Sequence, residues 1–257
     1  MQREIKVDLN ELLSPCSQEI AFIGAELPFI ASGCKEEEWR EKFTSEKIIE
    51  KLWGYQGFFT IENPNNPKLP LKLGFATVIR SFSVRQNRHI HPKTGEIMAI
   101  WTKQPNTCIV ELNGYLYQIK DSSILYIPPN VPHDLILTGP GITIDIKGLT
   151  FNDRTDNISP DIIDPHFVDK PSITTDEILY YDPSYGIDLI FGIKKEKNPS
   201  NQLKTQLPLI KYLTIIFNPE EILQNPNSFP KYQILPPDAP IPLNSIYLTI
   251  PTVNIKI

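Results

Sequence analysis

The sequence has no surplus of basic residues. Its 257 residues include 25 Lys and Arg against 30 Asp and Glu, so the formal net charge is −5 at pH 7. Proteins that bind nucleic acid or anionic membranes usually present clustered Lys and Arg, because these side chains neutralise phosphate groups. The composition therefore argues against nucleic acid and membrane partners. We expect a small-molecule partner instead, with a homodimer as a candidate assembly.

Cysteine is scarce and long apolar runs are absent. The three cysteines, Cys16, Cys34 and Cys108, are odd in number and far apart, so the sequence predicts no disulfide framework. No apolar run approaches the ~20 residues of a membrane span, and the residues after Met1 lack the pattern of a secretory signal. We expect a cytoplasmic protein with reduced thiols, in which Cys108 is a small buried residue.

Glycine is infrequent as well, with 12 residues, whereas proline, with 25, is about twice as common as in an average protein. Proline removes a backbone donor and interrupts long helices, so its spread along the chain favours short strands joined by turns. The length suffices for one large β domain or for a small domain with a companion. We therefore expect a mainly β protein.

Two kinds of local pattern follow one another along the chain. Residues 35–53 begin with acidic residues and continue with apolar residues at rough helical spacing, which predicts one or two short helices. Beyond them, short apolar or alternating runs separated by turn residues predict strands, and Asn113-Gly114 is a strong hairpin signal. The predicted strands cover 75–84, 97–101, 108–112, 115–119, 123–127, 133–137, 142–147, 177–181, 187–193, 210–217, 245–250 and 253–257.

Histidine is rare, but three of the four histidines lie between positions 89 and 133. His89 and His91 are two residues apart, so in a strand both side chains point to the same face. Glu96 follows a tight turn and His133 follows a proline-rich turn, and both can approach the same point. Three imidazoles and one carboxylate form a mixed N/O set suited to Fe(II), Mn(II), Ni(II) or Zn(II), with positions open for substrate. The absence of cysteine from this set disfavours a structural zinc site.

These residues resemble the two sequence motifs of the cupin superfamily. His89, His91 and Glu96 match the first motif, in which a His-x-His pair precedes a glutamate. Pro128 and His133 match the ends of the second motif. The resemblance implies that all four residues that bind metal in the family, three histidines and one glutamate, are present here. It also implies a double-stranded β-helix, a jelly-roll barrel that holds one divalent transition metal, with Fe(II) favoured.

The match covers about a quarter of the chain, roughly residues 75–150, and departs from the family pattern at a few positions. Asn130 stands where the second motif usually has glycine, a mild change because asparagine tolerates positive φ better than other non-glycine residues. Lys120 replaces the glycine of a common Gly-Asp turn. Ser83 and Lys103 stand where the longer form of the first motif has glycines.

The resemblance suggests three parts of the chain. Residues 1–62 would form an N-terminal arm and a helical segment that covers a barrel end or a dimer contact. Residues 63–152 would form the metal-binding cupin barrel. Residues 153–257 contain further predicted strands but no second His-x-His pair. This β-rich part is interpreted as a degenerate second barrel, with an extension of the first sheet as the alternative.

Four further residues are candidates for the site. Arg85 would lie inward if one strand register continued to His89, and its guanidinium could hold a substrate carboxylate. An exposed position at the rim is the alternative for this residue. Met98 and Ile100 alternate with Glu96 and should share its face. Tyr126, two residues before Pro128, could move a proton in the site or pack in the core.

Three functions fit this reading. The first is an Fe(II) oxygenase or dioxygenase acting on a small organic acid or aromatic substrate. The second is a redox-neutral isomerase, lyase or cyclase acting on a small acid or sugar, in which the metal is a Lewis acid and Tyr126 or Glu96 moves a proton. The third is a barrel that binds a small ligand without catalysis. Oxygen consumption separates the first from the second, and activity that survives replacement of His91 would favour the third.

Overall fold

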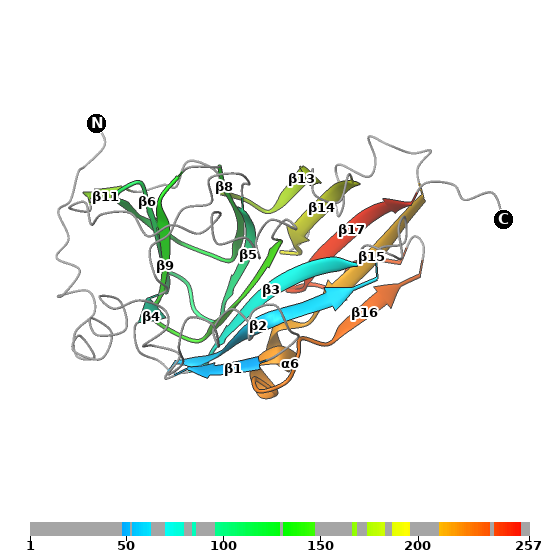
Figure 1. Ribbon diagram of the computed structural model, residues 1–257, viewed down its shortest axis with the longest axis horizontal. Helices are drawn as coiled ribbons and strands as arrows, with labels where there is room; N and C mark the ends of the chain where they lie inside the picture. Colours follow the sequence, from blue (N-terminus) through cyan, green and yellow to red (C-terminus); the bar gives the residue numbers. More distant parts are fainter. Residues whose placement is uncertain are drawn as a thin grey trace, which may run out of the picture.

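The computed structural model arranges the strands in three sheets, which follow one another from left to right in Figure 1. It describes residues 48–51, 53–62, 70–79, 84–85, 96–128, 131–146, 166–168, 174–182, 187–195, 211–236 and 239–252. The expected N-terminal arm, most of the expected helical segment, and both His89 and His91 lie outside these ranges.

A seven-stranded sheet forms the middle layer. Its strands run in the order β1-β2-β3-β10-β5-β8-β12, and each pair of neighbours whose register is given is antiparallel. Strand β10 is central, because it pairs with β3 on one side and with β5 on the other. The strands are β1 (Ile48–Lys51), β2 (Gly54–Ile61), β3 (Leu71–Val78), β10 (Gly141–Ile146), β5 (Glu96–Thr102), β8 (Ser123–Ile127) and β12 (Thr174–Thr175).

A five-stranded sheet in the order β11-β7-β6-β9-β4 faces the middle layer. The Asn113-Gly114 turn joins β6 to β7, and both residues have positive φ, 51° and 86°, as a type I′ hairpin requires. The hairpin predicted from this dipeptide is therefore confirmed. The strands are β11 (His166–Val168), β7 (Tyr115–Ile119), β6 (Cys108–Leu112), β9 (His133–Leu137) and β4 (Val84–Arg85).

The facing sides of these two sheets enclose one apolar cluster, here called the inner core. The pairs in both sheets are antiparallel except for β11 and β7, which are parallel. Two such sheets around a shared core are typical of a jelly roll, and they confirm the mainly β fold predicted from the sequence. The described strands remain in two separate sheets and do not close into one barrel. The inner core consists of Trp53, Ala76, Val78, Met98, Ile100, Cys108, Val110, Leu112, Ile119, Leu125, Ile127, Leu135 and Leu137.

The third sheet is built from the C-terminal residues and has the order β13-β14-β17-β15-β16. Its strands are β13 (Glu177–Asp182), β14 (Ile187–Ile193), β17 (Ile246–Thr252), β15 (Lys211–Phe217) and β16 (Tyr232–Leu235). Within the described part of the chain, residues 177–252 thus contribute a sheet of their own. Strands β11 and β12, which also follow residue 152, join the first two sheets.

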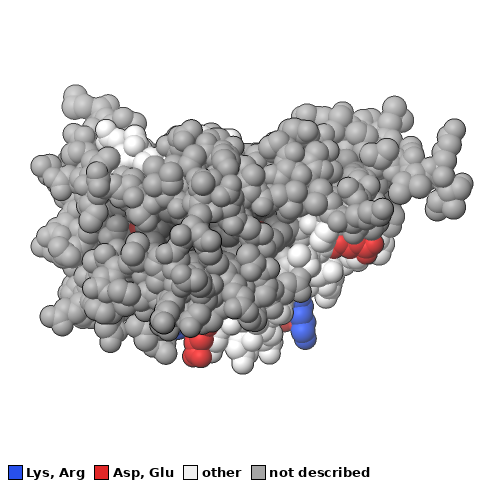
Figure 2. All heavy atoms as spheres, in the orientation of Figure 1, with Lys and Arg blue, Asp and Glu red and all other residues white. Residues whose placement is uncertain are grey.

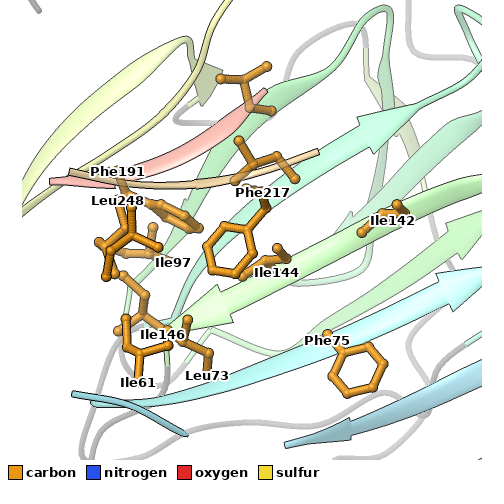
Figure 3. Packing of buried hydrophobic residues seen from close by; sticks show 14 of the residues in the cluster. Ile61, Leu73, Phe75, Ile97, Ile142, Ile144, Ile146, Phe191, Phe217 and Leu248 are labelled. Atoms are coloured by element: carbon orange, nitrogen blue, oxygen red, sulfur yellow. The ribbon is translucent and has the colours of Figure 1, made fainter. Parts of the chain in front are cut away.

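The C-terminal sheet packs on the outer side of the seven-stranded sheet through a second apolar cluster, here called the outer core. Figure 3 shows Phe217 of β15 beside Ile144 of β10, and Phe191 and Leu248 near Ile97 of β5. Phe217 also meets Phe59 of β2 edge to face, with ring centroids 5.9 Å apart. Alternate residues of β5 enter the inner and the outer core. In β10, the residues that alternate with the outer-core isoleucines are Thr143 and Asp145, which are buried as well, so both faces of the middle sheet are buried.

The structure differs from the sequence prediction at residues 48–51. This part of the expected helical segment is strand β1, in which Ile49 pairs with Gln56 and Lys51 with Gly54 of β2. The reason is a combination of local and tertiary preference. The β-branched pair Ile48-Ile49 favours a strand, and the neighbouring β2 offers a free edge that a helix could not use.

The helix α6 (Pro219–Gln224) was not predicted, although its start has a recognisable signal. The Asn218 side chain accepts hydrogen bonds from the backbone amides of Glu220 and Glu221, at 3.1 and 3.4 Å. Pro219 occupies the first turn, where its missing N–H has no cost. An asparagine cap, a first-turn proline and two acidic residues are typical of a helix N-terminus.

The few described charged side chains that are visible in Figure 2 lie apart from one another, at mid-height and along the lower edge of the view, and both signs occur. Among the described residues, no helix has the length and the apolar character needed to cross a bilayer.

Cys108 is fully buried in the inner core, as predicted. Burial raises the pKa of its thiol well above the ordinary value of 9.0. Because the thiolate is the reactive form, we expect Cys108 to react with a disulfide reagent more than about 100-fold more slowly in the folded than in the unfolded protein. The measurement uses a Cys16→Ser/Cys34→Ser variant at pH 8, and reaction at the unfolded rate would contradict the burial.

The same shift predicts how pH changes stability. Above pH 9 the unfolded chain releases the Cys108 proton while the folded chain keeps it, so the unfolded state binds fewer protons. The free energy of unfolding therefore falls as pH rises above this value. A Cys108→Ala variant lacks this contribution and serves as the control.

Candidate metal centre

Glu96 and His133 come from opposite sheets and meet at one end of the inner core. Glu96 is the first residue of β5 in the seven-stranded sheet, and His133 is the first residue of β9 in the facing sheet. Their side chains approach to 3.1 Å between His133 Nε2 and Glu96 Oε2. Both residues are buried, with 2% and 3% of their surface exposed. Two residues 37 positions apart in the sequence are thus direct neighbours.

The position of each side chain follows from the strand that carries it. Glu96 alternates with Met98 and Ile100 on the face of β5 that meets the inner core. The register pairs Glu96 with Ile127 and pairs His133 with Leu112, and both apolar partners belong to the same core. Two polar side chains therefore lie directly against an apolar wall. Such surroundings lower the local dielectric and strengthen electrostatic interactions between groups in the site.

A backbone carbonyl fixes the state of the His133 ring. The Nδ1 atom lies 2.8 Å from the carbonyl oxygen of Val131, which can only accept a hydrogen bond. Nδ1 therefore carries the proton, and in the neutral ring Nε2 presents a lone pair. A carbonyl partner on the other ring nitrogen is the usual arrangement for histidines that bind metal.

The geometry of the pair fits a bound cation. In a neutral imidazole with its proton on Nδ1, Nε2 is an acceptor, and an ionised Glu96 offers only acceptors as well. Two acceptors at 3.1 Å repel each other unless a proton or a metal ion lies between or beside them. Two ligands of one metal ion at about 2.1 Å and near a right angle would be about 3.0 Å apart. One imidazole nitrogen and one carboxylate oxygen also suit a divalent transition metal.

The structure brings together two of the four predicted ligands, Glu96 and His133. His89 and His91 lie outside the described residues, and their part in the site stays a prediction. Within the part of the chain that the structure describes, no group of three or more His, Cys, Asp or Glu side chains could hold a metal ion. The pair therefore represents the described portion of the predicted site.

The three residues predicted to bind substrate have different positions. Met98 and Ile100 lie on the same face as Glu96 and are packed into the inner core, with 4% and 0% exposure. Met98 is the next residue after Glu96 on this face of β5, whereas Ile100 is the one after that and lies farther from Glu96. Arg85 pairs through its backbone with Ile136 of β9, and its side chain lies outside the described part. Contact of these residues with a substrate stays a prediction.

Tyr126 lies on the other face of the middle sheet. It pairs with Ile97 of β5, and its ring packs against the outer core. Glu96, by contrast, pairs with the next residue, Ile127, which belongs to the inner core. The structure thus places Tyr126 in the packing position that was the alternative to a catalytic one, and it does not bring Tyr126 to Glu96.

Asp145 is a buried carboxylate that sequence reasoning missed. It is 5% exposed and pairs with Met98 of β5 on one side and with Gly74 of β3 on the other. Its carboxylate lies over Gly74, where a Cβ atom would collide with it. Asp145 and Glu96 are diagonal neighbours on one sheet face, which corresponds to roughly 7–8 Å between their Cα atoms, while the Asp145 carboxylate is directed toward β3. The signal was present, because apolar residues 142, 144 and 146 leave 145 on the opposite, inner face.

Comparison with known proteins gives structural likenesses only. No protein-family model matches the sequence, and no curated protein matches it. A variant of oxalate decarboxylase from B. subtilis is 9% identical over 82% of this chain and 76% of its own, with a TM-score of 0.37. Oxalate decarboxylase from Lactobacillus farciminis, in its formate complex, is 8% identical over 82% and 81%, with a TM-score of 0.36. A chain from a study of two DMSP lyases is 18% identical over 41% and 53%, with a TM-score of 0.29.

Proposed function

We propose that this cupin-like protein is a metal-dependent enzyme whose ligands are His89, His91, Glu96 and His133. The observation that carries the proposal is the 3.1 Å approach of Glu96 and His133 across two facing sheets. Burial of both groups supports it, because a carboxylate and an imidazole lone pair are costly to bury together without a cation. Such a site could also bind a small ligand without catalysis. Catalysis is favoured because four protein ligands would leave coordination positions of the metal open for substrate.

More specifically, we propose an Fe(II) oxygenase or dioxygenase that acts on a small organic acid or aromatic substrate. When bound, the metal would hold substrate oxygens and, as Fe(II), would supply electrons for the reaction with O2. Glu96 contributes an anionic oxygen, and His133 contributes Nε2 while Val131 holds its Nδ1 proton. The apolar residues Met98 and Ile127 keep water from the inner side of the pair, which suits chemistry with reactive species.

A redox-neutral lyase or isomerase is the second candidate, and one observation favours it. Asp145 is a second buried carboxylate on the inner face, diagonal to Glu96. A carboxylate in this position can accept a proton from a substrate or return one to it, which elimination and isomerisation both require. We therefore propose Asp145 for the proton-moving role, for which the sequence had suggested Tyr126 or Glu96.

The test combines metal content with oxygen uptake. Protein purified without oxygen should contain about one Fe, Mn or Ni ion per chain, as expected for a single site with four protein ligands. A His89→Ala/His91→Ala variant should contain none. The Fe(II)-loaded protein is then screened against small organic acids and aromatic compounds with an oxygen electrode, while product formation is followed in parallel.

Each outcome of this screen separates the candidates. Oxygen uptake in proportion to substrate loss supports the oxygenase. Substrate loss without oxygen uptake, slowed at least about tenfold by Asp145→Asn, supports the redox-neutral enzyme. Absence of metal from the unmodified protein, even after reconstitution, contradicts the proposal altogether.

A further inference from the structure

The loop that carries His133 is held by the turn between β6 and β7. The backbone amide of Asn113 in this turn donates a hydrogen bond to the carbonyl oxygen of Pro132, at 2.7 Å. Pro132 directly precedes His133, and Leu112, directly before the turn, is the register partner of His133 in β9. A shift of the turn is therefore transmitted to the histidine along two routes, the hydrogen bond and the strand ladder.

A buried carboxylate, that of Glu111, holds the Asn113-Gly114 turn in place. Glu111 Oε1 accepts a hydrogen bond from the backbone amide of Gly114, at 2.5 Å. Glu111 is 4% exposed, although a glutamate at the end of a hairpin would normally extend into water. A hydrogen bond from an amide to an ionised carboxylate is roughly twice as strong as one between neutral groups. Gly114, at φ 86°, thus has its amide anchored in a conformation that few other residues adopt.

Glu111 is also close to His133 through the sheet. It pairs across β6 and β9 with Asp134, the residue after His133. Asp134 is 2% exposed, and its Oδ1 accepts a hydrogen bond from the Leu135 amide, at 2.8 Å. Two buried carboxylates are therefore paired across β6 and β9 next to His133 in the sequence, on the face of the sheet opposite to its ring. A purely structural hairpin needs only the Asn-Gly dipeptide, so the conformation of the turn does not explain why Glu111 is buried.

We propose that Glu111 is a positioning residue for His133. Its bond to Gly114 fixes the turn, the turn holds Pro132 through Asn113, and the loop then presents the Nδ1 atom of His133 to Val131. The consequence is an Nε2 lone pair of His133 that is aimed at Glu96 before any ion arrives. The inference rests on the proposed function in one respect, namely that His133 binds a divalent metal.

Two substitutions at Glu111 separate positioning from packing. Glu111→Met keeps the length of the side chain but removes the acceptor, whereas Glu111→Gln keeps an oxygen that can accept from Gly114. We expect Glu111→Met to weaken Mn(II) binding about tenfold, which is within the range seen for groups that orient metal ligands. Glu111→Gln should bind Mn(II) about as tightly as the unmodified protein. The measurement is calorimetric titration of the metal-free protein with Mn(II). If Glu111→Met does not fold, Glu111→Asp, which is one methylene shorter, provides the same comparison.

A matched control excludes a general loss of stability. Glu177 accepts a hydrogen bond from the Tyr247 hydroxyl in the C-terminal sheet, and Glu177→Met removes that acceptor far along the sequence from the site. This variant should lower the free energy of unfolding and leave Mn(II) affinity unchanged. The proposal would be overturned if Glu111→Met bound Mn(II) with unchanged affinity, or if Glu111→Gln bound it as weakly as Glu111→Met is expected to.

A readout without metal distinguishes the two proposals. In the metal-free protein, the Nδ1 proton of His133 should be visible by NMR because its bond to Val131 slows exchange with water. We expect exchange to be about tenfold faster in Glu111→Met and close to that of the unmodified protein in Glu111→Gln. If the unmodified protein binds no Mn(II), the proposed function fails. The exchange rate of the His133 Nδ1 proton then decides by itself whether Glu111 positions the ring. An unchanged rate in Glu111→Met would then reject the positioning role.

Discussion

Replacement of His133 by alanine is expected to lower the affinity for divalent metal by more than about 100-fold, since even the partners that orient a ligand are worth about 10–100-fold. The substitution removes the Nε2 atom that faces Glu96 at 3.1 Å and leaves a buried carboxylate without this partner. Turnover that depends on metal should fall by a similar or larger factor. Metal analysis and calorimetric titration with Mn(II) measure the first effect, and the activity screen measures the second.

The control for His133→Ala is the histidine outside the predicted site. His166 begins β11, at the edge of the first five-stranded sheet, where its backbone pairs with Tyr115. His166→Ala should bind metal with the affinity of the unmodified protein. His133→Gln, which keeps a polar side chain of similar size, reduces the risk of misfolding and should still bind metal poorly. Normal metal binding by a folded His133→Ala protein would show that the four predicted ligands are wrong.

The approach of Glu96 and His133 could be predicted in outline because histidine is rare in this chain. Three of four histidines lie within positions 89–133, and the spacing of Glu96 and His133 matched two known motifs. The contact between them was not predictable from periodicity, because alternation gives the face of each strand but not which sheets oppose each other. The role of Val131 was equally hidden, since it acts through a backbone carbonyl that has no signature in the sequence.

Strand existence was predictable, and strand pairing was not. Alternating runs indicated β5 to β10 and most strands of the C-terminal sheet, and the Asn113-Gly114 turn indicated the β6–β7 hairpin. The order β13-β14-β17-β15-β16 depends on contacts between distant segments, for which a single sequence offers no local signal. Strand β1 was misassigned for the same reason, because its pairing with β2 outweighs a rough helical spacing of apolar residues.

Tyr126 shows how one register step decides on which face of a sheet a candidate residue lies. A proline-rich turn after Tyr126 left its face open to either interpretation. The pairing of Ile127 with Glu96 places Ile127 in the inner core and turns Tyr126 toward the outer core. Because side chains alternate with a period of two, a shift of one residue would have exchanged these positions. Asp145 lies on the same face as Glu96, and it is therefore the residue that we propose for the proton-moving role.

The second large effect is expected at Gly192 in the C-terminal sheet. The ring of Tyr247 crosses over Gly192 on β14 and reaches Glu177 on β13, to which its hydroxyl donates a hydrogen bond. A Cβ atom on Gly192 would collide with the Tyr247 ring, which is 3% exposed and has no free space to move into. Gly192→Ala should therefore lower the free energy of unfolding by about 2–3 kcal/mol, the usual cost of overpacking a core. Urea unfolding measures this change.

A double-mutant cycle tests whether the Tyr247 ring is the cause. Tyr247→Ala alone should cost about 3–5 kcal/mol, because it removes a buried aromatic ring and its bond to Glu177. In that background the collision is gone, so adding Gly192→Ala should be neutral or stabilise by about 0.5 kcal/mol, as alanine normally does relative to glycine in a strand. Gly139→Ala, whose Cβ would meet the Thr107 side chain at 3.2 Å, is the control and should cost less than about 1 kcal/mol. If Gly192→Ala remained equally destabilising without the ring, the strain would reside in the β14 backbone, and the assigned packing of Tyr247 would be wrong.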